Sequence, residues 1–134
     1  MGQRIRNILL IAGAAMLLLS SVCFAVDLPD ADLQFVDARG DTGYYVDMYS
    51  INRISDHEVE AGVAMVKTRT NRMFLYTIHF DTAASTYQIL DSKILRYDTK
   101  EQIGGSSQPM PPGKYVPNTP MQAIVDFLYS SGNE

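Results

Sequence analysis

Cysteine, histidine and tryptophan are almost missing from this sequence. Its 134 residues include one cysteine, Cys23, two histidines and no tryptophan. A lone cysteine cannot form an intramolecular disulfide, so a folded domain must be stabilised by its apolar core. His57 and His79 have no further ligand at metal-binding spacing such as i+2 or i+4. The sequence therefore predicts no metal site and no cofactor.

Catalytic motifs are also missing. No G-x-S-x-G elbow occurs. The stretch from Gly105 to Lys114 is superficially similar to a phosphate-binding loop, but it is followed by Tyr115 rather than by a helix that could receive an anion. We therefore predict no catalytic residues and expect a protein that is not an enzyme. A hydrolase with an unusual site is the least favoured of the functional hypotheses.

Runs of positive charge are absent as well. The formal net charge is −4, and the Lys and Arg residues are scattered. Proteins that bind nucleic acid or anionic lipid usually carry clustered Lys and Arg. The charge pattern therefore argues against both as partners.

The first 25 residues contain no acidic side chain and have the three zones of an export signal. Arg4 and Arg6 precede an apolar run over 8–19, and small residues end the segment at Ala25. The run is shorter than the roughly 20 residues that a membrane-spanning helix needs. We predict a signal peptide over 1–25, cleavage between Ala25 and Val26, and an exported product in the periplasm, at the cell surface or outside the cell.

Two alternatives to simple cleavage remain open. Cys23 could receive a lipid, although the branched Val22 before it suits that reaction poorly. The segment could also stay as an uncleaved anchor. Cleavage at Ala25 would remove Cys23 and leave no stable membrane insertion. It would leave nine Lys and Arg against fifteen Asp and Glu in a chain of single-domain length.

After a leader over 26–32, strand-like segments alternate with turns. Apolar and polar residues alternate with a period of two, so Tyr44 and Val46 share one face while Tyr45 and Asp47 share the other. One face is consistently apolar and the other is mixed, which is typical of an antiparallel sheet covered on one side only. The predicted strands are 33–38, 44–52, 58–69, 73–81 and 86–97.

The C-terminal part changes from loop to helix. Residues 102–117 are rich in Gly and Pro and are predicted to form a loop, with at most a short extended piece. Thr119 is the expected N-cap, and Gln122 is expected to complete a capping box. Met121, Ile124, Val125 and Leu128 form one apolar stripe, and Gly132 can close the helix.

These patterns predict an α+β domain over 33–134. It should contain a single, mostly antiparallel sheet of five to six strands, with a C-terminal helix at about 120–131 packed on one face. On the face opposite the helix, strand alternation predicts a binding patch with two tyrosines around a carboxylate. Its members are Tyr45, Asp47, Tyr49, Leu75 and His79.

The order of several short motifs resembles the surface-adhesin protein E family of small exported bacterial proteins. These motifs are Tyr44-Tyr45-Val46-Asp47 with Ser50-Ile51, Val59 to Lys67, Phe80-Asp81 leading to Tyr87-Gln88-Ile89, and Val116-Pro117-Asn118-Thr119. The resemblance implies one antiparallel sheet with a terminal helix, and attachment to host matrix proteins. Two features differ from the family: no cysteine remains to tie the helix to the sheet, and Met65 stands near a position where a tryptophan is common.

The sequence therefore predicts a non-enzymatic, adhesin-like module of the bacterial envelope that binds a protein partner or a second copy of itself. The alternative is a periplasmic domain that holds a small ligand in a pocket between helix and sheet. An apolar pocket under the helix would favour the alternative, whereas a flat aromatic face would favour the first reading.

Overall fold

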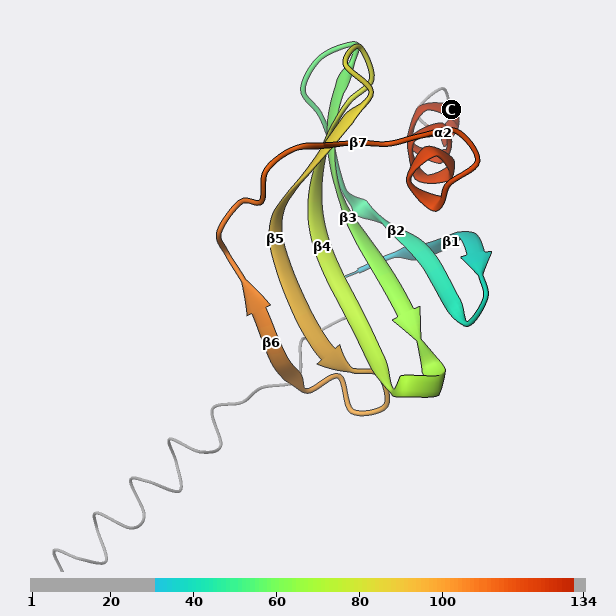
Figure 1. Ribbon diagram of the computed structural model, residues 1–134, viewed down its shortest axis with the longest axis vertical. Coiled ribbons are helices and arrows are strands. Elements are labelled where there is room, and N and C mark those ends of the chain that lie inside the picture. Colours follow the sequence, from blue (N-terminus) through green and yellow to red (C-terminus); the bar gives the residue numbers. More distant parts are fainter. Residues whose placement is uncertain (1–30, 132–134) are drawn as a thin grey trace, which may run out of the picture.

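The computed structural model describes residues 31–131 (Figure 1). The predicted signal peptide with its cleavage point at Ala25–Val26, Cys23, the leader up to residue 30 and Gly132 lie outside this range. The elements are β1 (Leu33–Arg39), β2 (Thr42–Arg53), β3 (Glu58–Lys67), the short 3-10 helix η1 (Thr68–Thr70), β4 (Arg72–Asp81), β5 (Thr86–Arg96), β6 (Gln102–Ser106), β7 (Gly113–Lys114) and α2 (Pro120–Ser131).

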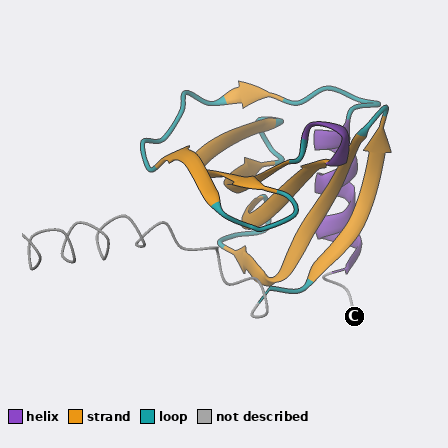
Figure 2. Cartoon of the chain, turned by 90° about the horizontal axis from the view of Figure 1, so that it is seen from below, coloured by secondary structure: helices purple, strands orange, loops and turns teal. Residues whose placement is uncertain are grey.

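The strands form one antiparallel sheet in which six follow one another in chain order, from β1 to β6. The short strand β7 pairs with β5 beside Thr86 and Tyr87. The sheet is strongly curved (Figure 2), and α2 contacts β1 and β2. The predicted fold class is thus confirmed. No helix within residues 31–131 is long and apolar enough to cross a membrane.

Two strand predictions need correction. The third strand ends at Lys67 rather than Arg69, because η1 and Asn71, with a φ of 55°, reverse the chain there. The stretch 102–117 contains two strands, β6 and β7, where at most one short extended piece was predicted; its remaining residues form loop, as predicted. Gly and Pro lower strand propensity, but the free edge of β5 offers backbone partners that composition does not reveal.

The main core lies between α2 and the sheet. Ile124 and Leu128 of the helix are fully buried in one cluster with Val46, Ile78 and Phe80. This confirms the predicted apolar stripe. Burial of such aliphatic side chains stabilises a fold by about 1.5–3 kcal/mol each, which is how a small domain holds together without a disulfide.

Both ends of α2 have specific contacts. Thr119 Oγ1 accepts a hydrogen bond from the Gln122 amide at 3.4 Å, as the predicted cap requires. The Gln122 side chain donates to Asp126 Oδ1 at 2.9 Å rather than returning to the cap, so only one half of the expected capping box is made. At the other end, the Arg53 guanidinium donates to the Leu128 carbonyl oxygen and lies 5.1 Å from the ring centre of Tyr129. A cation is favourable at a helix C-terminus.

The helix covers one face, as predicted, but the opposite face also has a second, smaller core, which the sequence prediction missed. Ala64, Val66, Met73 and Leu95 are buried there. Leu33, Tyr45 and Leu75 pack around them and are half-buried. Because the sheet curls (Figure 2), side chains at this corner shield one another without a covering helix.

Candidate binding surface

The predicted patch begins on β2, where the strand has a large bulge of several extra residues. Asp47 pairs with Gly62 and Asn52 pairs with Glu60, so the segment 48–51 faces Ala61 alone. Strict alternation therefore fails after Asp47. Tyr49 lies on this bulge and is 76% exposed.

The Asp47 side chain accepts hydrogen bonds from the backbone at this bulge. Its Oδ1 accepts hydrogen bonds from the amides of Asp32, at 3.0 Å, and Tyr49, at 3.1 Å. The Ser50 hydroxyl donates to the Asp47 carbonyl oxygen at 2.7 Å and accepts from the Gly62 amide at 2.6 Å. These bonds replace ladder bonds that the extra residues interrupt. Asp47 is thus tied to the strand rather than standing as a free polar centre.

Tyr45 and Leu75 do lie together, in a cross-strand row that runs from Phe35 through Tyr45 and Ala64 to Leu75. Phe35 is 57% exposed and meets Tyr45 edge to face, with ring centres 5.7 Å apart and an interplanar angle of 74°. The sequence prediction missed Phe35. Its position two residues after Leu33 in the first strand was the signal that would have placed it on this face.

A groove of about 330 Å³, open to solvent, lies beside this pair of rings. It runs along the turn that joins β1 to β2, where Gly40 adopts a φ of 59°. Its lining is apolar on the sheet side and polar at the turn: Phe35, Ala38, Gly40, Asp41, Thr42, Gly43, Tyr45, Val66 and Thr68. We call Phe35, Tyr45, Leu75 and this groove the open-face patch.

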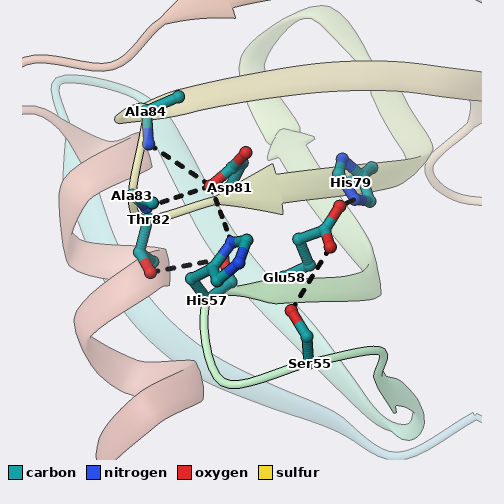
Figure 3. Close-up of polar contacts among 8 residues, drawn as sticks. All are labelled: Ser55, His57, Glu58, His79, Asp81, Thr82, Ala83 and Ala84. Carbon is teal, nitrogen blue, oxygen red and sulfur yellow. Dashed lines mark hydrogen bonds and ion pairs between the residues drawn. The ribbon is translucent and has the colours of Figure 1, made fainter.

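His79, the last predicted member, lies at the other end of the face. It is four residues beyond Leu75 on β4, about 13 Å at 3.3 Å per residue. Its Nε2 lies 3.2 Å from Glu58 Oε1, and Ser55 Oγ donates to Glu58 Oε2 at 3.3 Å (Figure 3). The structure thus brings Tyr45 and Leu75 together and leaves Tyr49 and His79 apart from them.

A second histidine–carboxylate pair adjoins the first (Figure 3). His57 Nδ1 lies 3.2 Å from Asp81 Oδ1, which also accepts from the amides of Ala83 and Ala84 at 3.0 and 3.3 Å. Desolvation acts to raise the pKa of Asp81, but these amides and His57 outweigh it and lower that pKa. In the described part of the chain, no group of three or more His, Cys, Asp or Glu side chains is placed to hold a metal ion.

The helix-bearing face also has an uncovered region, which the sequence prediction missed. A cross-strand row of half-buried residues runs through Tyr44, Met65, Phe74 and Ile94. Phe74 stacks on Tyr76 with ring centres 6.3 Å apart. A helix of 12 residues is about 18 Å long, whereas a ten-residue strand is about 33 Å long. These lengths alone indicate that α2 cannot cover the whole face.

Two tyrosines on this face are kept in their neutral form. Desolvation raises the pKa of Tyr44, and the nearby Asp37 adds to the effect while Arg39 opposes it. Desolvation also raises the pKa of Tyr76, with a further contribution from Tyr44. Their hydroxyl groups are therefore hydrogen-bonding groups rather than charges at neutral pH.

The sheet, the helix and the open-face patch are thus defined by this chain's own geometry. Comparison of the chain with protein-family models, curated proteins and solved structures found no match. The resemblance to the surface-adhesin protein E family therefore stays a hypothesis, and membership is not established.

Proposed function

We propose that this chain is an exported protein of the bacterial envelope whose β domain binds a protein partner, without catalysis, through the open-face patch. The observation that carries the proposal is the exposed ring of Phe35, packed edge to face on Tyr45 beside the groove. An exposed apolar patch beside polar groups is typical of a protein-interaction site.

The aromatic rings of the patch are supported by packing contacts, which favours binding. Tyr45 packs on the second core, and Phe35 rests on Tyr45. Aromatic side chains with few rotatable bonds lose little entropy when a partner covers them. The resemblance to an adhesin family supports the same function.

The alternative of a small-ligand pocket between helix and sheet has less support. Ile124 and Leu128 are fully buried in the same cluster as Val46 and Phe80, so side chains occupy the centre of that contact. The described geometry therefore favours a surface interaction.

Export gives the first prediction. Mass spectrometry of the protein recovered from the envelope fraction should show Val26 as the first residue and no lipid. The physical reason is the order of charge, apolar run and small residues in 1–25. An intact Met1, or diacylglycerol on Cys23, would contradict the export proposal.

The patch gives the second prediction. Phe35→Ser should reduce capture of protein from envelope extract or host matrix by about tenfold, because the loss removes an exposed aromatic anchor. The measurement is quantitative pull-down by the immobilised domain, with circular dichroism to confirm folding.

Val116→Ser is the matched control, since Val116 is 55% exposed but lies outside the patch. It should leave capture unchanged. Analytical ultracentrifugation of the same variants tells whether the partner is a second copy of the chain, in which case Phe35→Ser would weaken self-association. A folded Phe35→Ser protein that keeps both capture and self-association would show that the patch is ordinary surface.

A further inference from the structure

A proline-rich connection follows the outer edge of the sheet, on the side opposite β1. We call residues 107–114 the proline strap. It leaves β6, runs along the outside of β5 and ends in β7 (Figure 1). Both β6 and β7 pair with β5, so the sheet fixes the two ends of the strap.

The middle of the strap is also anchored. The Met110 amide donates to the Ile89 carbonyl oxygen at 2.9 Å, and the Gln88 side-chain amide donates to the Met110 carbonyl oxygen at 3.0 Å. Gly113 lies against the ring of Tyr87, where an added Cβ would be 3.3 Å from ring atoms. The strap is therefore held at three points along β5.

Prolines restrict the backbone of the strap to an extended form. Pro109, Pro111 and Pro112 each have a fixed φ, and a residue before proline is pushed into the β or polyproline II region. A polyproline II helix has three residues per turn, so Pro109 and Pro112 fall on the same side of it. All residues from Ser106 to Pro112 are exposed, and Met110 is 52% exposed.

The charge of the strap differs from that of the chain. No Asp or Glu occurs between Gln102 and Val125, although the whole chain has fifteen. Lys114 is the one cation in that interval, and its side chain is exposed. The strap thus presents two prolines at a three-residue interval, followed two residues later by a positive charge.

We propose that the proline strap is a recognition element for a protein domain with an aromatic-lined groove and a neighbouring carboxylate. Aromatic-lined grooves of the SH3 type bind Pro-x-x-Pro segments in the polyproline II form. Pro109 and Pro112 supply that repeat, and Lys114 supplies a partner for the carboxylate. Anchoring by β5 lowers the entropy lost on binding.

Edge protection is the competing explanation. Prolines are often found at sheet edges, where they prevent pairing with another chain. That role requires neither the three-residue interval nor an exposed Lys114, and it requires the strap to stay closed against β5. The two explanations therefore differ in whether an added domain can bind the folded protein.

The test uses an isolated SH3 domain that accepts Pro-x-x-Pro-x-Lys peptides as the immobilised probe. The folded protein should bind it at least as tightly as a synthetic peptide covering 107–115. Pro112→Ala and Lys114→Ala should each weaken binding by about tenfold, because each removes one recognised group. Lys114→Arg should restore binding to within about threefold, since it keeps the charge.

Pro117→Ala is the matched control, because Pro117 is also exposed but lies beyond the strap. It should leave the affinity unchanged. The proposal is overturned if the peptide binds and the folded protein does not, if neither binds, or if Pro112→Ala and Lys114→Ala bind as well as the original protein. Phe35→Ser should bind the probe normally, so this result is independent of the open-face patch.

Discussion

Leu128→Ala is expected to lower the free energy of unfolding by about 2–5 kcal/mol, a large part of the stability of a domain this small. Leu128 is fully buried in the cluster that joins α2 to the sheet. Truncation removes apolar contacts and leaves a cavity that the surrounding side chains fill only in part. Urea denaturation followed by circular dichroism measures the change.

Asp126→Ala is the control on the same helix. Asp126 is exposed and accepts one hydrogen bond from Gln122, so its loss should change stability by no more than about 0.5 kcal/mol. A Leu128→Ala protein as stable as the original would mean that the helix does not pack on the sheet in solution.

Ser50→Ala is expected to lower the free energy of unfolding by about 1–3 kcal/mol, although the change removes a single oxygen atom. The Ser50 hydroxyl bridges the bulge in β2, donating to the Asp47 carbonyl oxygen and accepting from the Gly62 amide. Its removal leaves a donor and an acceptor without these partners in a half-buried place. Denaturation measures the stability, and hydrogen exchange should show faster exchange at the Gly62 amide.

Ser130→Ala is the matched serine control. The Ser130 hydroxyl is exposed and donates to the Phe127 carbonyl oxygen within the same helix, where water can replace it. Its loss should change stability by no more than about 0.5 kcal/mol. If Ser50→Ala behaved in the same way, the hydroxyl bridge would not be what holds the bulge and the exposed Tyr49 in place.

The open-face patch shows where local sequence patterns stop being sufficient. Alternation placed Tyr45 and Leu75 on one face, and the register of β2, β3 and β4 puts them in one row. The same rule could not place Tyr49, because four residues of β2 face one residue of β3. A bulge depends on hydrogen bonds to another strand, here through Ser50. The residues next to it in the sequence therefore do not predict its position.

The second core could not be predicted from the sequence for a related reason. Ala64 and Val66 alternate with Val63 and Met65, so the end of β3 is apolar on both faces. Local alternation then assigns no unique buried side. Burial of Ala64 and Val66 depends on Met73 and Leu95 from other strands. The residues that line the groove beside Phe35 likewise come from separate strands.

The sequence by itself determined the secondary structure that rests on short-range effects. Alternation over neighbouring residues defined β4 and the first part of β3, and Thr119, Pro120 and the apolar stripe defined α2, because propensity and caps act within a few residues. The tertiary structure alone decided the pairing of β6 and β7 with β5, the bulge in β2, the second core and the meeting of Phe35 with Tyr45. Each of these depends on contacts between segments far apart in the chain, and strand register and sheet curvature fix those contacts only when the whole sheet has formed.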